Sequence, residues 1–143
     1  MKVLDPDLLL RAYAIGVFPM SDSRDAKDVF WVEPRRRAIL PLDRFHLSKS
    51  LSKTLKSGRF LISVDQCFAD VVRRCADRED TWINDEIERS YNLPHTAGHA
   101  HSVEVWAPDP EGPGRILVGG LYGVRLGAAF FGESMFHRAR GAS

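Results

Sequence analysis

The sequence predicts an α+β fold organised around a mostly antiparallel sheet. From residue 60 onward, segments with strand and helix periodicity follow one another in the order β-α-α-β-β-β. The last three strands are joined by short turn segments such as 109–114, rich in Pro and Gly, which suit the hairpins of an antiparallel sheet. Residues 1–59 contain only short elements and an excess of basic residues. We therefore expect a small N-terminal basic domain over 1–59 and a second domain over 60–143.

The first expected element is a helix that begins at Pro6. Asp5 is a favoured N-cap, and proline suits the first helical position. Apolar residues recur at helical spacing as far as Tyr13, and Gly16 can end the helix in a left-handed conformation. The pattern then predicts extended chain at 17–20, a surface loop at 21–28, strands at 29–32 and 37–42, and a short basic helix at 48–57.

Six further elements are expected between residue 60 and the end of the sequence. Phe68, Val71 and Cys75 recur with the helical period, and Pro94 and Gly98 bound the end of a second helix. The predicted helices cover 66–78 and 85–95, and the predicted strands cover 60–64, 102–106, 116–124 and 128–136.

The composition is that of an ordinary soluble globular protein. The 143 residues are 44% hydrophobic and 27% charged, and no apolar run approaches the ~20 residues that a membrane-spanning helix needs. The N-terminus lacks the apolar stretch of a secretory signal, so we expect a cytoplasmic protein with no membrane contact. Cys67 and Cys75 stand eight residues apart on a predicted helix, too far for a disulfide, and are interpreted as reduced core residues.

Positive charge is concentrated in residues 35–60. This segment holds eight basic residues and one acid, Asp43, for a net charge of +7. Such a local field attracts phosphates, although an isolated basic run is more often a solvated face. The basic residues are Arg35, Arg36, Arg37, Arg44, Lys49, Lys53, Lys56 and Arg59.

Two groups of residues have the types that carry chemistry. His95, His99 and His101 lie near Glu104, but no HExxH motif is present, so we expect hydrogen-bonding histidines and no metal. Glu133 lies in the apolar strand 128–136, where a buried carboxylate is costly unless it is paired. It is therefore either bound to an internal arginine or directed into a cleft.

Two arrangements of this strand are open. Strict alternation places Phe131, Glu133 and Met135 on one face. A β-bulge at Gly132 would instead bring Phe130 to the face of Met135.

Seven segments in order resemble the leucyl/phenylalanyl-tRNA–protein transferases. Each match is weak alone, but together they span nearly the whole chain at plausible spacing. They are Leu-Leu-Leu-Arg-Ala-Tyr-Ala-Ile-Gly-Val-Phe-Pro-Met (8–20), Trp31 with Pro34 and Arg37, Phe-His-Leu-Ser-Lys-Ser-Leu (45–51), Thr-Trp-Ile (81–83), Gly-His-Ala-His-Ser-Val-Glu-Val-Trp (98–106), Gly-Gly-Leu-Tyr-Gly-Val (119–124) and Phe-Gly-Glu-Ser-Met-Phe (131–136).

The resemblance implies a fold and a reaction. The fold would be a small N-terminal domain followed by a GNAT-like (N-acetyltransferase-like) domain. The reaction would move Leu or Phe, with Met as a further candidate, from aminoacyl-tRNA to the α-amine of proteins that begin with Arg or Lys, which marks them for N-end-rule degradation. The implied partners are aminoacyl-tRNA and these acceptor proteins. No cofactor is implied, and the protein is expected to be monomeric.

The resemblance also implies roles for individual residues. Glu133 and Tyr91 match positions that bind the acceptor, and basic residues of 35–60 would contact tRNA phosphates. The expected tRNA contacts are Arg35, Arg36, Arg37, Lys49, Lys53, Lys56 and Arg59. The expected aminoacyl pocket comprises Trp31, Trp82, Leu121, Phe130 and Met135, of which Leu121 stands where relatives carry Met.

Members of this family continue beyond the position of Ser143, which stands where a helix cap is expected. We therefore expect a C-terminally truncated member that is weakly active or inactive alone. An Asp and a Gln proposed for proton handling would lie in the continuation, so catalytic residues are unassigned.

Two alternatives from other classes remain open. One is a non-catalytic tRNA-binding module that uses residues 35–60. The other is an acyl-CoA acetyltransferase, because Arg138–Ser143 misses the pyrophosphate-loop pattern R/Q-x-x-G-x-G/A only at its last position.

Overall fold

The computed structural model describes residues 2–142 and has the predicted α+β class. Its centre is an antiparallel sheet in the order β3 (Leu61–Val64), β4 (Ala100–Pro108), β5 (Arg115–Leu126) and β6 (Ala129–His137). A smaller antiparallel sheet pairs β1 (Phe18–Met20) with β2 (Phe30–Val32). Ser143, the expected helix cap, lies outside the described residues.

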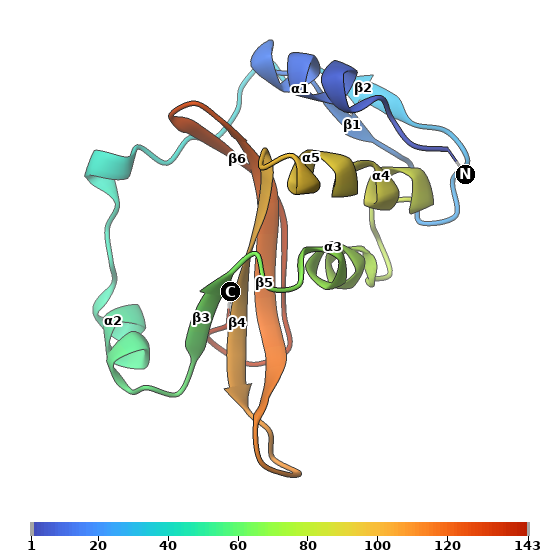
Figure 1. Ribbon diagram of the computed structural model, residues 1–143. Helices are drawn as coiled ribbons and strands as arrows, with labels where there is room; N and C mark the ends of the chain where they lie inside the picture. Colours follow the sequence, from blue (N-terminus) through green and yellow to red (C-terminus); the bar gives the residue numbers. More distant parts are fainter. Residues whose placement is uncertain (1, 143) are drawn as a thin grey trace.

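Most of the helices lie on one side of the central sheet (Figure 1). This group comprises α1 (Pro6–Ala14), α3 (Phe68–Ala76), α4 (Asp85–Ser90) and α5 (Asn92–Thr96). Helix α2 (Lys49–Lys56) and the short 3-10 helix η1 (Leu42–Arg44) belong to residues 33–60, which stand away from this group. We call residues 33–60 the arm. Among the described residues, no helix has the length and apolar character to cross a membrane. We call the side of the sheet that carries α3 the covered face and the other side the open face.

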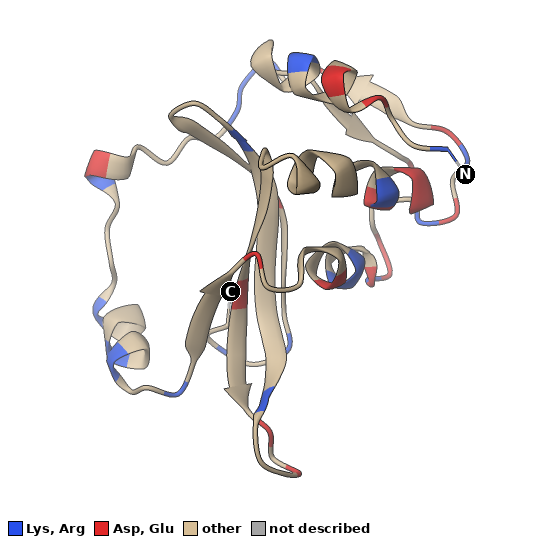
Figure 2. Cartoon of the chain, viewed as in Figure 1, with Lys and Arg blue, Asp and Glu red and all other residues tan. Residues whose placement is uncertain are grey.

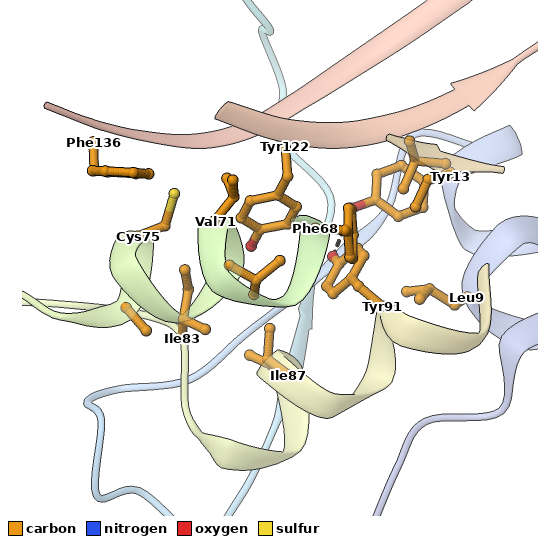
Figure 3. Packing of buried hydrophobic residues seen from close by; sticks show 14 of the residues in the cluster. Leu9, Tyr13, Phe68, Val71, Cys75, Ile83, Ile87, Tyr91, Tyr122 and Phe136 are labelled. Atoms are coloured by element: carbon orange, nitrogen blue, oxygen red, sulfur yellow. Dashed lines mark hydrogen bonds between the residues drawn. The ribbon is translucent and has the colours of Figure 1, made fainter. Parts of the chain in front are cut away.

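The hydrophobic core lies between α3 and the covered face and extends to α1. Leu9 and Tyr13 of α1 are 0% and 1% exposed, and they join one cluster with residues of α3, α4 and the sheet (Figure 3). Tyr91 and Tyr122 are also fully buried, with ring centroids 5.4 Å apart. The core therefore carries three tyrosine hydroxyls, each of which needs a hydrogen-bonding partner.

The helix caps follow the sequence signals. The Asp5 side chain accepts hydrogen bonds from the backbone N–H groups of Asp7 and Leu8, and Gly16 adopts a φ of 83° after the helix ends. Ser48 caps α2 by accepting from the N–H of Leu51. The predicted strands and the helix at 66–78 are present with shifts of a few residues at their ends, except in the two segments described next.

Two predicted elements are wrong. Residues 37–42 do not form a strand, because the segment lies in the arm away from either sheet, and Ile39 is 82% exposed. The single helix predicted at 85–95 is two helices that meet at Tyr91. Pro94 has no backbone N–H to donate to the carbonyl of Ser90, so a continuous helical ladder cannot form there.

A β-bulge in β6 decides which side chains reach the core. Tyr122 of β5 pairs with Ser134 and Gly123 pairs with Gly132, so Glu133 is an extra residue without a partner on β5. The alternation therefore shifts by one at this point. Phe130 and Met135 share the open face, as the bulge alternative predicted, and strict alternation, which placed Glu133 with Met135, is wrong.

We expect Tyr122→Phe to stabilise the protein. Among the described residues, the Tyr122 hydroxyl is a buried polar group without a hydrogen-bond partner, and such a group costs about 1–3 kcal/mol. Its removal should raise the free energy of unfolding by about 1 kcal/mol in urea titrations.

The matched control is Tyr91→Phe. The Tyr91 hydroxyl lies 2.7 Å from the Tyr13 hydroxyl, so this variant loses a buried hydrogen bond and should be less stable by about 1 kcal/mol. Equal losses in both variants would show that the Tyr122 hydroxyl does have a partner.

Candidate functional site

Glu133 is a nearly buried carboxylate that pairs with a cation from the arm. Its side chain is 2% exposed, and its Oε1 lies 3.4 Å from Nη2 of Arg37. Arg37 follows β2, so the pair joins the beginning of the arm to the bulge of β6. Of the two alternatives predicted for Glu133, an internal arginine or a cleft, this contact supplies the arginine.

Two tyrosines continue the site into the core. Tyr13 of α1 interacts with the Glu133 carboxyl group and lowers its pKa, and the Tyr13 hydroxyl also lies 2.7 Å from that of Tyr91 (Figure 3). Either tyrosine can donate in the hydrogen bond between the two hydroxyls. Tyr91, Tyr13 and Glu133 thus form a chain of contacts.

Burial controls the protonation of these groups. It raises the pKa of Glu133 from an ordinary 4.5 to about 7, although the Tyr13 hydrogen bond and the Arg37 charge act in the opposite direction. Burial also raises the pKa of Tyr13 and that of Tyr91 well above the usual value, so both remain neutral donors. The site thus holds one carboxylate that titrates near neutrality.

A cavity of about 310 Å³ opens beside this carboxylate. Apolar side chains, two arginines and the Glu133 carboxylate line it. The lining residues are Phe18, Met20, Pro34, Arg36, Arg37, Ala38, Trp82, Gly132 and Glu133. The cavity therefore offers apolar surface beside a single carboxylate, which is paired with Arg37.

The five residues expected to form an aminoacyl pocket lie in three places. Leu121 pairs with Met135 on the open face, and the Phe130 ring lies against Gly123 on the same face. Phe130 and Met135 are about half exposed, at 48% and 55%.

The two tryptophans of that set lie elsewhere. Trp82 packs against the core and lines the cavity beside Glu133. Trp31 lies in β2 opposite Pro19 and is 38% exposed. The structure therefore brings Leu121, Phe130 and Met135 together and places Trp82 on the Glu133 side.

Most of the expected tRNA contacts lie on the arm, where Figure 2 shows basic positions in blue, and they are solvent-exposed. Lys49, Lys53 and Lys56 are exposed on α2, and Arg59 follows with its guanidinium over the ring of Phe60. Arg35 and Arg36 are exposed after β2. Arg37 is different, because its guanidinium is turned inward to Glu133.

The histidines near Glu104 make structural hydrogen bonds. Nδ1 of His101 lies 2.7 Å from a carboxylate oxygen of Asp65, and Nδ1 of His95 lies 2.8 Å from the carbonyl of Ala100. Glu104 is fully buried and accepts from the Ser63 hydroxyl and the Gln66 N–H. These contacts fix the rings of His95 and His101.

The sequence matches models of one family over most of its length. The model described as "Leucyl/phenylalanyl-tRNA protein transferase" matches residues 39–143, and its N-terminal domain model matches 3–35. A leucyl/phenylalanyl-tRNA–protein transferase of Rhizorhabdus wittichii is 61% identical over 147 residues, which cover 100% of this chain and 57% of the relative. Proteins of the same name from Roseobacter denitrificans and Zymomonas mobilis are 57% and 54% identical, over 98% and 99% of this chain and 64% and 52% of their own lengths.

The chain belongs to the leucyl/phenylalanyl-tRNA–protein transferase family. It spans between about half and two thirds of the length of these curated relatives.

Two residues of the Glu133 site, Tyr13 and Phe18, could not be predicted from the sequence. Tyr13 was assigned only to the apolar stripe of α1, and nothing local indicates that its hydroxyl reaches residue 133. Phe18, whose ring lies 4.8 Å from the Arg37 guanidinium carbon, was read only as extended chain. Both contacts depend on packing between distant segments, so no pattern within either segment could reveal them.

Glu133→Gln should remove one source of pH dependence in the free energy of unfolding. The folded protein holds the Glu133 proton up to a pKa of about 7, against an ordinary 4.5, so ionisation of this group lowers stability as pH rises through that window. Relative to the variant, the wild type should lose roughly 2 kcal/mol of unfolding free energy between about pH 5 and about pH 7.5.

Urea titrations of both proteins at the two pH values measure this difference. The exposed Glu79→Gln serves as a control that changes the same functional group without burial, and it should follow the wild type. A constant difference between wild type and Glu133→Gln across the range would mean that Glu133 ionises as an ordinary carboxyl.

Proposed function

We propose that this chain carries the acceptor and aminoacyl sites of an enzyme that transfers Leu or Phe, with Met as a further candidate, from aminoacyl-tRNA to proteins with N-terminal Arg or Lys. The observation that carries the proposal is the buried Glu133 carboxylate beside an apolar cavity, in a chain of this family. The new N-terminus would mark the acceptor for N-end-rule degradation. The protein acts in the cytoplasm as a monomer.

Glu133 is the proposed binding group for the cationic side chain of the acceptor. A carboxylate that is 2% exposed needs a cation, and an N-terminal Arg or Lys supplies one. Tyr91 contributes through Tyr13, because its hydroxyl lies 2.7 Å from the Tyr13 hydroxyl, and Tyr13 in turn interacts with the carboxyl group. Tyr91 is therefore a positioning residue in this proposal.

The aminoacyl side chain is proposed to bind on the apolar residues that the family resemblance implies. Leu121, Phe130 and Met135 form an apolar surface on the open face, next to the bulge that carries Glu133. Trp82 stands at the cavity on the other side of β6, and Trp31 lies in β2. An apolar surface of this kind suits Leu, Phe and Met and offers no hydrogen-bonding partner to polar side chains.

The reaction makes modest demands on acid–base chemistry. The aminoacyl ester is already activated, and an α-amine with a pKa of about 7.7–8.0 is roughly 10–20% free base at neutral pH. A general base adds about 10²–10⁴-fold, whereas positioning of two substrates supplies up to about 7–11 kcal/mol. Activity therefore depends mainly on complete binding sites, and we expect the 143-residue chain to be weakly active or inactive alone.

The direct test is transfer of radiolabelled leucine from leucyl-tRNA to a peptide that begins with Arg. A peptide that begins with Ala is the control. A full-length relative should label only the Arg peptide, and this chain should do so at less than about one tenth of that rate, since positioning carries most of the barrier reduction. Equal labelling of both peptides would contradict the acceptor role of Glu133.

A second candidate is a non-catalytic tRNA-binding module, which the exposed lysines of α2 favour. Phosphate binding through Lys49, Lys53 and Lys56 would be independent of the attached amino acid and would weaken steeply with salt. Binding that requires tRNA charged with Leu or Phe would exclude the pure module.

Lys53→Glu/Lys56→Glu should weaken tRNA binding under either candidate. Each lost phosphate contact lowers the slope of log K against log salt by about one, so the double variant should lose about two units of slope and bind at least about tenfold more weakly at low salt. Fluorescence anisotropy with labelled tRNA measures both quantities.

The control is Lys2→Glu/Lys27→Glu, which changes the net charge equally at exposed lysines outside the arm. It should bind nearly as the wild type does. Equal loss in both double variants would assign the effect to overall charge and not to α2.

A further inference from the structure

Arg37 occupies a slot whose shape and charge fit a guanidinium group. Its guanidinium carbon lies 4.8 Å from the ring centroid of Phe18 and 5.6 Å from that of Phe131, and its Nη2 contacts Glu133. Two aromatic rings and a carboxylate are the partners that a guanidinium prefers. We call the site formed by Phe18, Phe131 and Glu133 the guanidinium slot.

The slot is closed to external cations while Arg37 fills it. Glu133 is 2% exposed, whereas one third of the Arg37 side chain, 33%, faces solvent above it. Arg37 and Glu133 both line the cavity that opens at this point. A cation that enters this cavity therefore meets Arg37 before it can pair with the carboxylate.

Arg37 can leave the slot without unfolding the core. It belongs to the irregular segment 33–41, which follows β2 and forms the first part of the arm. Glu133, by contrast, is held by the bulge of β6 and by Tyr13 of α1. The carboxylate is thus the fixed half of the pair, and the arginine is the movable half.

We propose that Arg37 is an internal stand-in for the acceptor, and that an N-terminal arginine displaces it from the guanidinium slot. The inference rests on the proposed function, because it takes Glu133 as the acceptor site. An unpaired buried carboxylate is strongly unfavourable, so the slot exchanges one cation for another and rejects neutral side chains. The aromatic walls favour arginine over lysine, since a planar guanidinium stacks on both rings.

Arg37 also lowers the apparent affinity of the guanidinium slot for an external ligand. A ligand that must displace an internal competitor binds with an apparent affinity reduced by the fraction of molecules in which the slot is open. Removal of Arg37 should therefore tighten binding of a free guanidinium ligand. A permanent structural ion pair would behave differently, because its loss would destabilise the protein without creating a binding site.

The test is calorimetric titration of the 143-residue chain with L-arginine amide. Arg37→Ala should bind it at least about tenfold more tightly than the wild type does, and about three- to tenfold more tightly than it binds L-lysine amide. The matched control is Arg11→Ala, which removes an exposed arginine of α1 outside the cavity and should bind as the wild type does. Arg37→Ala/Glu133→Gln should lose the gained binding.

A second measurement uses the wild type and therefore tests the proposal even if the Arg37→Ala variant does not fold. The Arg37 Nε resonance of the wild type, assigned by its loss in Arg37→Lys, should shift toward the position of an exposed arginine as arginine amide is added. An unchanged resonance, or equal affinity of Arg37→Ala and Arg11→Ala, would overturn the stand-in role. Slot binding without transfer to an Arg peptide by a full-length relative would instead reject the proposed function and leave the slot intact.

Discussion

The site depends on one extra residue in an edge strand. Because Glu133 has no partner on β5, the alternation of β6 shifts by one residue, and the carboxylate is carried to the covered face next to Tyr13. In a regular strand it would share the open face with Met135, where solvent would screen it. The bulge thus explains at once the burial of Glu133, its raised pKa, the tyrosine chain behind it and its need for Arg37.

The same bulge separates two chemical environments across a single strand. The covered face carries the carboxylate and its donors, while the open face carries Leu121, Phe130 and Met135. Gly123 permits this arrangement, since a Cβ there would lie 2.6 Å from the Phe130 ring. In our proposal, a cationic acceptor and an apolar aminoacyl group therefore approach from opposite sides of β6 and meet near residues 130–135.

Local signals predicted most of the fold but only part of the site. Asp5, Ser48 and Gly16 marked helix ends correctly, because caps depend on neighbouring residues alone. The prediction of a strand at 37–42 was wrong because a strand needs a neighbouring strand. Within the described residues, the apolar residues of this segment pair with none. The need of Glu133 for a cation followed from elementary electrostatics. The roles of Tyr13 and of the aromatic walls of the slot arise instead from tertiary contacts between segments that are separate in sequence. The division of the chain at residues 59 and 60 stays a prediction.

The most direct measurement of this account is the pKa of Glu133 itself. Carbon-detected NMR titration of the protein labelled at glutamate carboxyl carbons resolves each side chain, and Glu133→Gln assigns the resonance. A buried carboxylate held by the bulge should titrate with a pKa of about 7. A pKa at the ordinary value of 4.5 would contradict the account, because burial would then not outweigh the opposing effects of Arg37 and Tyr13 on this carboxyl group.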